Sequence, residues 1–346
     1  MKILHLLESP HFSGAENVVC QIIGMMRGEK NVEMVYSSRD GQIRQALKER
    51  DITFTPIKEL TVKEVKRVIK EQQPDLIHAH DMRASFIAAL ACGKLPLVSH
   101  IHNNAFNSRG ISKKSIAYLY AGLKAKHIFW VSNSSFKGYA FHRFLNHKSS
   151  VLYNIINTEE LYNKMHKDLQ EYDYDIVYLG RLTPPKNPQR LLHILKLVIE
   201  QLPEIKIAII GTGDLENETK KLAQEYNLLN NISFLGFQSN PLKILYDSKV
   251  MVMSSRWEGT PMCALEAMAL GVPIVSTPVD GLRDIVRSGE NGYLSDDDNE
   301  FASRICLVVK NKEIHKKWSE QMLADAKKVN NIENYRSEIL KAYKNK

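Results

Sequence analysis

Short apolar runs of strand length alternate with amphipathic segments of helical length along the chain, and this alternation limits the folds open to it. In the first half, the predicted strands are residues 3–7, 32–36, 53–56, 76–79, 97–100, 128–131 and 150–153. The predicted helices are residues 15–27, 62–72, 82–92 and 112–125. Such alternation is typical of a doubly wound parallel sheet, whose functional loops follow the carboxyl ends of the strands.

The alternation is interrupted once, by a polar segment at 163–174, and then resumes. We therefore predict an α/β protein of two Rossmann-like domains facing a cleft, with residues 1–162 and 175–330 as the domains and 163–174 as the linker. The final segment, 331–346, has apolar residues at helical spacing. The pattern alone allows this helix either to stay on the second domain or to cross back to the first.

Composition excludes several classes of protein. No apolar run approaches the ~18 residues of a transmembrane helix. The first apolar run is only five residues long and has no small-residue cleavage site after it, so we interpret it as a strand and not a signal peptide. The four cysteines are scattered without a C-x-x-C pair, which favours a reducing cytoplasm and no structural zinc.

Positive charge is concentrated in the first half of the chain. The formal net charge is +8, and residues 1–170 alone carry +9. Residues 82–158 contain ten Lys or Arg and no Asp or Glu, whereas a solvated surface normally mixes both signs. This bias indicates an anionic partner, which could be a nucleic acid, an anionic membrane surface or a phosphorylated substrate.

The stretch 254–271, SSRWEGTPMCALEAMALG, is the most informative segment for function. It follows an apolar strand-like run at 250–253, so it is predicted to be a turn and a helix. Thr260 suits the N-cap and Pro261 the first helical position, while Gly271 is predicted to end the helix as a left-handed cap.

The start of this helix has the groups needed to bind a nucleotide sugar. The amides of Met262, Cys263 and Ala264 would point out of the helix terminus, where the dipole favours a phosphate. Glu258 before the helix and Glu266 within it could accept hydrogen bonds from sugar hydroxyls. The alternative is an ordinary turn with two surface glutamates.

The run E-G-T-P-M-C-A-L-E-A-M-A-L-G-V-P-I-V resembles the E-x7-E signature of the retaining glycosyltransferases of family 4. The match extends beyond the two acids to Pro261 and Gly271. The resemblance implies the GT-B architecture, with the C-terminal helix crossing back to the first domain. It also implies that Glu258 contacts the donor sugar and Glu266 the ribose of its nucleotide.

A second loop carries two cations five residues apart. Gly180-Arg181-Leu182-x-x-x-Lys186-Asn187-Pro188 lies between a predicted strand and a predicted helix. Arg181 and Lys186 could clamp a diphosphate and stabilise the charge that develops on it as a leaving group. Two solvated cations are the alternative, but the segment is similar to the family's G-R-L-x-x-x-K-[GN].

Glycines follow several predicted strands. Gly14 lies in the first strand-to-helix turn, where it could admit a ligand or simply form a tight turn. The family usually has two glycines there, and this chain has Ser13 and Gly14. By resemblance, the loops that contain Gly211, Gly236 and Phe237 line the nucleotide and its base.

Two histidine pairs lie at predicted strand ends, His78 with His80 and His100 with His102. A spacing of two places both members of a pair on one face, where zinc could be imagined, but no Cys or acidic cluster completes such a site. We therefore predict no metal. The segment V-S-H-I-H-N-N resembles the family's T-x-H-x, which implies that His102 lies beside the transferred sugar.

Together these observations predict a retaining, metal-independent glycosyltransferase that needs no cofactor beyond its nucleotide-sugar donor, with a UDP-sugar favoured. Basic residues interleaved with aromatic ones in 82–158 suit anionic lipid headgroups. We predict a lipid-linked glycan acceptor in cell-surface polysaccharide biosynthesis, and peripheral attachment to the inner face of the plasma membrane. The alternatives are a soluble acceptor, a nucleotide-sugar epimerase, or a nucleic-acid-binding protein, which would leave the Arg181, Lys186 and Glu258 set unexplained.

Overall fold

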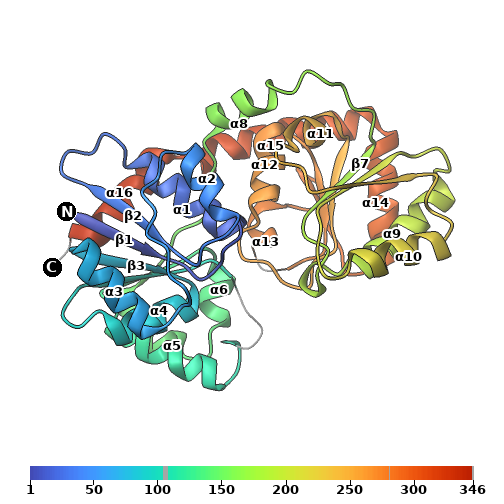
Figure 1. Cartoon of the computed structure of the whole chain (residues 1–346). Coiled ribbons are helices and arrows are strands. Elements are labelled where there is room, and N and C mark those ends of the chain that lie inside the picture. The colour runs from blue at the N-terminus through green and yellow to red at the C-terminus, as the bar shows by residue number, and fades with distance from the viewer. Residues whose placement is uncertain (104–107, 280, 345–346) are drawn as a thin grey trace. The chain divides into compact units, whose positions relative to one another are not determined.

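The structure is a computed structural model of the chain and describes residues 1–103, 108–279 and 281–344. Two compact units divide the chain: Met1–Asn154 together with Ile332–Lys346, and Ile155–Asn331. Each unit has a six-stranded parallel sheet with helices on both faces (Figure 1). The predicted α/β class with two Rossmann-like domains is confirmed.

The first unit has the strand order β2-β1-β3-β4-β5-β6. Its strands are β1 (Lys2–Leu6), β2 (Glu33–Ser37), β3 (Leu76–His80), β4 (Leu97–Ile101), β5 (His127–Trp130) and β6 (Ser149–Val151). Its helices are α1 (Gly14–Met25), α2 (Ile43–Glu49), α3 (Val62–Gln72), α4 (Asp81–Ala91), α5 (Lys113–Lys124), α6 (Asn133–Gly138), α7 (His142–Leu145) and α16 (Ile332–Lys344). The chain reverses its direction of winding between β1 and β3, so the loops after these two strands flank the topological switch point, where doubly wound sheets bind ligands.

The second unit has the strand order β12-β11-β10-β7-β8-β9. Its strands are β7 (Ile176–Leu179), β8 (Ile207–Ile210), β9 (Ile232–Gly236), β10 (Val250–Met253), β11 (Ile274–Ser276) and β12 (Gly292–Leu294). Its helices are α8 (Thr158–Met165), α9 (Pro188–Gln201), α10 (Glu216–Glu225), α11 (Leu242–Asp247), α12 (Met262–Leu270), α13 (Leu282–Ile285), α14 (Asp298–Lys310) and α15 (Lys312–Val329). Here the switch point lies between β7 and β10, the two strands that precede the loops singled out above.

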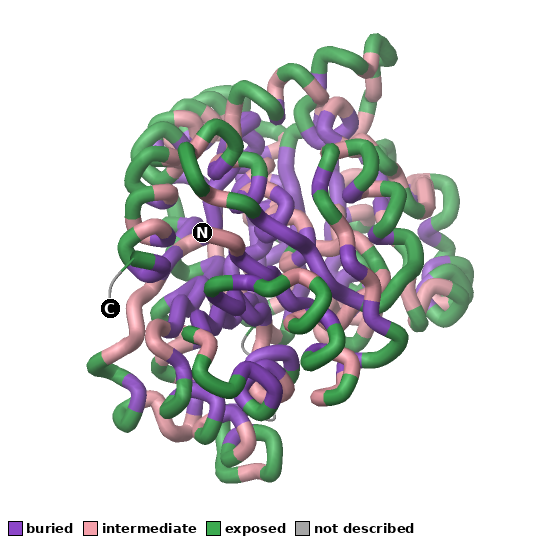
Figure 2. The backbone as a smooth tube through the Cα atoms, turned by 60° about the vertical axis from the view of Figure 1, so that its left-hand side comes forward, coloured by how far each residue is buried: buried purple, intermediate pink, exposed green. Residues whose placement is uncertain are grey.

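The central strands are buried on both faces, which explains their continuous apolar character. The β7, β8 and β10 strands contain Val177, Ile209 and Val252, all of which have 1% or less of their surface exposed. Figure 2 shows the same pattern across the molecule, with buried backbone in the interior and exposed backbone on the outer turns of helices and loops.

The C-terminal helix α16 belongs to the first unit, as the resemblance implied. Its buried face includes Tyr335, Ile339 and Tyr343, and it packs against α1. The Tyr343 hydroxyl lies 2.7 Å from Nδ1 of His78 on β3. The last helix is therefore part of the core of the unit that the first strand begins.

The first boundary differs from the expected one, because residues 163–174 lie inside the second unit. The second unit begins at Ile155, and the segment 158–165 forms α8, whose Leu161 and Met165 are buried. The Tyr162 hydroxyl donates to the Ala269 carbonyl at 3.1 Å, and Tyr172 packs against the same core. Two apolar residues among many polar ones were too weak a signal to predict this helix.

One predicted strand is also wrong. Residues 53–56 form no named strand; Phe54 makes an isolated parallel bridge with Tyr36 at the edge of β2. The apolar pattern there reflects packing at the sheet edge.

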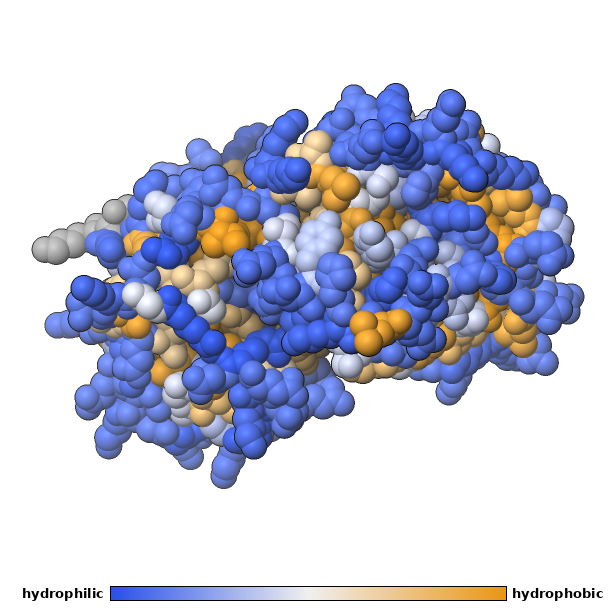
Figure 3. All heavy atoms as spheres, turned by 90° about the horizontal axis from the view of Figure 1, so that it is seen from above, coloured by the Kyte–Doolittle hydropathy of each residue, from blue (hydrophilic) through white to orange (hydrophobic). Residues whose placement is uncertain are grey.

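No helix in the described part of the chain is long and apolar enough to cross a bilayer. The face drawn in Figure 3 is mostly hydrophilic, with separate apolar patches.

Candidate active site

An ion pair joins the two loops at the switch point of the second unit. Lys186, in the 3-10 turn η3 (Pro184–Lys186) after β7, places Nζ 2.5 Å from Oε1 of Glu258, in the loop after β10. The side chains retain 18% and 9% of their exposure, so the pair lies in the protein but is reachable from solvent. The structure thus brings together two residues 72 positions apart that the sequence had assigned to one ligand.

Polar contacts hold both loops in place. The Ser255 hydroxyl donates to Glu258 Oε1 at 2.6 Å, and the Thr277 hydroxyl donates to the Ser255 carbonyl at 2.7 Å. The Ser254 hydroxyl donates to the Lys186 carbonyl at 3.0 Å. Asn187 adopts a left-handed conformation, with φ of 55°, which turns the chain from η3 into α9. Charged groups positioned by such a network need little reorganisation when a ligand binds.

Electrostatics keep Lys186 charged. Burial by itself would lower the pKa of Lys186, but the adjacent Glu258 carboxylate outweighs it and raises the pKa above its ordinary value. The exposed Arg181 guanidinium lowers the pKa of Lys186, so the two cations are close enough to influence each other. Burial raises the pKa of Cys263 to about 12, so this neighbour is a neutral thiol.

The helix after the second loop starts one residue later than expected. Pro261 is the N-cap of α12 and Met262 its first residue, so Thr260 is not the cap; assignments of helix ends commonly differ by this much. The Ala264 amide already donates to the Pro261 carbonyl at 3.1 Å. The Met262 and Cys263 amides have no backbone acceptor within the described chain. Gly271 ends the helix in the left-handed conformation, with φ of 73°, as predicted.

Glu266 lies half-buried on α12 without a bonded partner among the described residues. Burial raises its pKa to about 7, and the Lys164 cation only partly opposes that shift. A carboxyl group whose pKa is near 7, and whose oxygens have no hydrogen-bond partner among the described residues, can accept hydrogen bonds from hydroxyl groups or donate one. This is the environment expected for a residue that binds the two hydroxyls of a ribose.

Glycines let neighbouring loops approach closely at the same edge of the sheet. Gly211 follows β8 with φ of 132°, and a Cβ there would lie 2.0 Å from the Gly180 carbonyl oxygen. Gly236 ends β9 with φ of 63°, and its carbonyl accepts from the Gly211 amide at 2.7 Å. The next residue, Phe237, is 71% exposed. An exposed aromatic ring beside a ligand-binding edge is suited to stacking on a base.

In the first unit, Gly14 lies after β1, which borders the other switch point, and His102 lies after β4, the strand next to β3. Gly14 is exposed at the start of α1, and the Ser13 amide before it donates to Glu16 Oε2 at 3.2 Å, completing a capping box. His102 is buried just after β4, and its amide donates to Oδ1 of Asp81 at 2.9 Å. Burial raises the pKa of Asp81 to about 7.

The histidine pairs are part of a larger cluster that the sequence did not reveal. His5 on β1 joins His78, His80, His100 and His102, and all five rings are buried. Burial holds their pKa values well below 6.5, so the rings are neutral. His5 lies in the first predicted strand, but its place in the cluster follows only from the adjacency of β1 and β3, which puts His5 in register with His78. Ser255 and Asp81 had no comparable signal.

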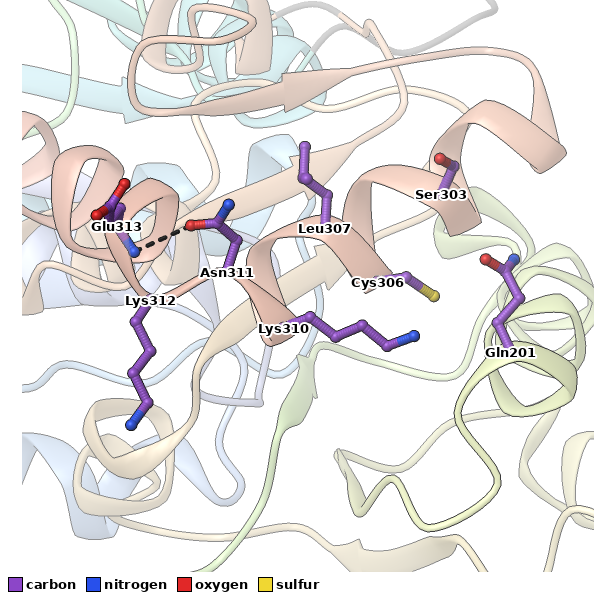
Figure 4. Close-up of a pocket in the computed structure, with 8 residues that line it drawn as sticks. All are labelled: Gln201, Ser303, Cys306, Leu307, Lys310, Asn311, Lys312 and Glu313. Carbon is purple, nitrogen blue, oxygen red and sulfur yellow. Dashed lines mark hydrogen bonds between the residues drawn. The ribbon is translucent and has the colours of Figure 1, made fainter.

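Two other features do not contribute to the site. Asp173-Tyr174-Asp175 spells D-x-D, which resembles the metal–diphosphate signature of a different transferase fold. Here Asp173 pairs with Lys206 at 2.5 Å and Asp175 with Lys249 at 2.7 Å, before β7 begins. Figure 4 shows a hollow lined by the end of α9, the end of α14 and the start of α15. Helix ends of a parallel sheet return to the amino ends of the strands, so this hollow lies away from the switch-point loops.

Two family models match the chain. Glycosyltransferase Family 4 matches residues 12–160, and Glycosyl transferases group 1 matches residues 163–324. An uncharacterized glycosyltransferase of Methanocaldococcus jannaschii is 31% identical over 232 residues, which are 61% of this chain and 57% of the relative.

A second relative is similar over nearly its full length. The UDP-Gal:alpha-D-GlcNAc-diphosphoundecaprenol alpha-1,3-galactosyltransferase of Escherichia coli is 25% identical over 90% of this chain and 89% of its own. Among solved structures, Anabaena HepE in complex with UDP and glucose matches with a TM-score of 0.87 and 21% identity over 99% of both chains. At that identity the likeness establishes the fold.

The two family models together cover most of both units, and the relatives from Methanocaldococcus jannaschii and Escherichia coli are named as glycosyltransferases. The chain therefore belongs to the glycosyltransferases of the family 4 type, and it is an enzyme of the hexosyl- or N-acetylhexosaminyl-transferase class.

Proposed function

We propose that this enzyme transfers a sugar, with retention of anomeric configuration and without a metal ion, from a UDP-sugar to a lipid-linked glycan in cell-surface polysaccharide assembly. The acceptor would be presented at the cytoplasmic face of the plasma membrane. The proposed binding of the donor rests on the Lys186–Glu258 pair at a switch point, together with the carboxyl of Glu266, which has no bonded partner among the described residues.

The second unit supplies groups for each part of a nucleotide sugar. Arg181 and Lys186 would bind the diphosphate together with the Met262 and Cys263 amides and stabilise its charge as the leaving group departs. Glu258 would bind hydroxyls of the sugar while it keeps Lys186 charged and oriented. Glu266 would bind the ribose, and the exposed Phe237 ring would stack on the base.

Two points support chemistry without a metal. Arg181 and Lys186 would supply the positive charge that a divalent ion otherwise brings to a diphosphate, and the carboxylates of Asp173 and Asp175 already pair with Lys206 and Lys249. His102 in the first unit would contact the transferred sugar through its ring. The reaction would then break the bond between the anomeric carbon and the diphosphate oxygen, and the acceptor hydroxyl would attack from the same face.

The donor proposal is tested by binding and turnover of one variant pair. UDP should raise the melting temperature of the wild type, and transfer from a UDP-sugar should continue in EDTA. Lys186→Ala should lower kcat about 100- to 1000-fold, as expected for a group that stabilises developing charge. Lys206→Ala is the matched control, because Lys206 also forms a 2.5 Å ion pair with a carboxylate but lies just before β8, at the amino ends of the strands.

The products separate transfer from the alternatives. Release of UDP together with a glycosylated acceptor supports the proposal. Conversion of the donor to an epimer would instead show an epimerase, and equal activity of Lys186→Ala and the wild type would contradict the diphosphate role.

The acceptor half rests on an apolar and basic surface of the first unit. On α5, Ile116, Tyr120 and Leu123 lie on one face of the helix and are exposed, with 54% of Ile116 and of Leu123 accessible. Lys113 and Lys114 are exposed at the start of the same helix. Apolar side chains beside cations are typical of helices that rest on anionic lipid headgroups.

Only part of the acid-free segment is available for this role. The Lys124, Lys126 and Lys148 ammonium groups donate to backbone carbonyls at 2.8, 3.1 and 2.8 Å. Phe129 and Trp130 are core residues. The surface cations that remain include Lys113, Lys114, Lys137 and Arg143, each of which would contribute about 1 kcal/mol near an anionic bilayer.

The nearly full-length relative from Escherichia coli is named for a diphosphoundecaprenol acceptor, which supports a lipid-linked acceptor for this chain. Vesicle sedimentation tests the membrane step. Wild-type protein should pellet with phosphatidylglycerol vesicles at low salt and remain in the supernatant with phosphatidylcholine alone.

The matched variants reverse two charges each. Lys113→Glu with Lys114→Glu should abolish sedimentation, and Lys312→Glu with Lys317→Glu, exposed on α15 of the second unit, should not. A wild-type protein that stays in the supernatant with anionic vesicles at low salt would refute the membrane step and favour a soluble acceptor. The donor chemistry would survive that result.

A further inference from the structure

The buried face of the first sheet carries an unusual line of imidazole rings. His5, His78 and His100 come from three adjacent strands, β1, β3 and β4, while His80 ends β3 and His102 follows β4. Strand register places His5 opposite His78 and His80 opposite His100, so alternate residues put these rings on one side of the sheet.

Three of the rings form a hydrogen-bonded ribbon. His5 Nδ1 lies 3.0 Å from His80 Nε2, and His80 Nδ1 lies 2.8 Å from His102 Nε2. The ring centroids of these two pairs are 5.3 and 5.1 Å apart and their planes differ by 19° and 25°, so the hydrogen-bonded rings meet near their edges. His78 and His100 form a second layer, stacked on His80 and His102 with ring centroids 4.3 Å apart in both cases.

The ribbon geometry differs from that of a metal site, although His80, His100 and His102 are close enough to suggest one. Nitrogen ligands of a tetrahedral zinc ion lie about 3.4 Å apart with lone pairs converging on the ion, because each Zn–N bond is about 2.1 Å. The facing nitrogens of His80 and His102 are 2.8 Å apart, the distance of a direct hydrogen bond. Two stacked layers also give His100 and His102 nearly parallel planes, 28° apart.

Proton accounting allows two arrangements of the ribbon. Each neutral ring has one N–H and one lone pair. In one arrangement His5 donates to His80, His80 donates to His102, and His102 Nδ1 carries a proton. In the other, both hydrogen bonds are reversed: each ring carries its proton on Nε2, and His102 Nδ1 carries a lone pair. In both, His102 Nε2 is occupied by His80.

The ends of the ribbon are buried and uncommitted. His5 Nε2 and His102 Nδ1 have no hydrogen-bond partner among the described residues, and His102 is fixed from its backbone by Asp81. Since a buried polar atom without a hydrogen-bond partner destabilises the folded state, the free Nδ1 is a group that a substrate hydroxyl would satisfy.

We propose that His80 and His5 are positioning residues: their ribbon orients His102, occupies its Nε2 and leaves Nδ1 as the atom that contacts the substrate. This deepens the proposed function, because it rests on the role of His102 beside the transferred sugar. Nδ1 would donate a hydrogen bond in the first arrangement and accept one in the second, and the ring is neutral in both.

Three variants test the positioning role by sugar transfer. His80→Leu should lower kcat at least about 10-fold with little change in KM for the donor, because a misoriented group costs turnover more than binding. His80→Asn, whose amide can replace the hydrogen bond to His102, should recover activity to within about threefold of the wild type. His100→Leu is the matched control, because His100 is equally buried but makes no hydrogen bond to the ribbon.

Nitrogen NMR of the histidine rings gives a readout that does not depend on activity. In the wild type, His102 should show a neutral ring with Nε2 hydrogen-bonded, and His80→Leu should shift that Nε2 resonance while His100→Leu should not. Failure of every donor with the wild type would refute the proposed function and leave this readout intact.

Other outcomes overturn the positioning role itself. Loss of activity in His100→Leu as large as in His80→Leu would show a structural effect of the whole cluster. An unchanged His102 resonance in His80→Leu, or a stoichiometric transition metal in the purified enzyme by mass spectrometry, would also refute the ribbon.

Discussion

Lowering the pH from 7.5 to 5.0 is expected to destabilise the first unit, because its core holds histidines that must stay neutral. Burial lowers the pKa of both His5 and His102 to about 3, whereas an unfolded chain titrates near 6.5. Below 6.5 the unfolded state therefore binds more protons than the folded state. Stability falls as the pH falls, and it continues to fall until the folded pKa is reached.

The magnitude follows from the titration of one ring. At pH 5.0 an unfolded histidine is 1.5 pH units below its pKa, so each of these two rings costs about 2 kcal/mol at ~1.36 kcal/mol per unit. His78, His80 and His100 act in the same direction. Asp81 opposes them. Its pKa of about 7 lies above that of an unfolded Asp, so the folded state binds this proton at a higher pH than the unfolded state does. That difference raises the free energy of unfolding by roughly 2.6 kcal/mol at pH 5.0.

A single substitution isolates the contribution of one ring from these opposing terms. The free energy of unfolding of His5→Asn should fall between pH 7.5 and 5.0 by about 2 kcal/mol less than that of the wild type. Urea unfolding followed by Trp130 fluorescence, with Trp257 and Trp318 replaced by Phe, reports on the first unit alone, because Trp130 lies in its core.

The exposed His147, replaced by Asn, is the control and should leave the drop unchanged. The same pH dependence in His5→Asn and in the wild type would refute the argument that the buried ring stays neutral.

Three further predictions concern the second unit. Arg181→Ala should lower kcat by orders of magnitude, since such groups contribute ~3–4 kcal/mol to the transition state, and normal transfer rates would remove the clamp. Glu266→Ala should weaken UDP binding by roughly 1.5–3 kcal/mol in calorimetry, whereas Glu258→Ala should leave UDP affinity nearly intact and damage transfer; equal losses would contradict these roles. Gly211→Ala should lower the free energy of unfolding by about 1–3 kcal/mol or more, because the new Cβ would lie 2.0 Å from the Gly180 oxygen at a φ of 132°. An unchanged denaturation midpoint would refute that contact.

Local pattern in the sequence predicted most of the fold and part of the site. The apolar runs at β7, β8 and β10 match buried strands, because both faces of a parallel sheet are covered and such strands favour apolar residues. Gly271 was predicted as a helix end because only a residue without a side chain adopts the left-handed conformation at little cost. The loop at Glu258 and the loop at Arg181 were likewise visible as motifs.

The order of the strands in each sheet decided which residues are neighbours. Periodicity shows that β7 and β10 are strands but not that they are neighbours, so the contact of Lys186 with Glu258 was expected only through the ligand that both would bind. The ribbon of His5, His80 and His102 needed β1 beside β3 and β3 beside β4. Its neutrality depends on burial, which is a property of the packed sheet and its covering helices. The sequence by itself determines which segments are strands, helices and ligand-binding turns, because those depend on residues close together in the chain. The tertiary structure alone decides the pairings and the protonation of the buried rings, because both depend on contacts between strands that the chain visits far apart.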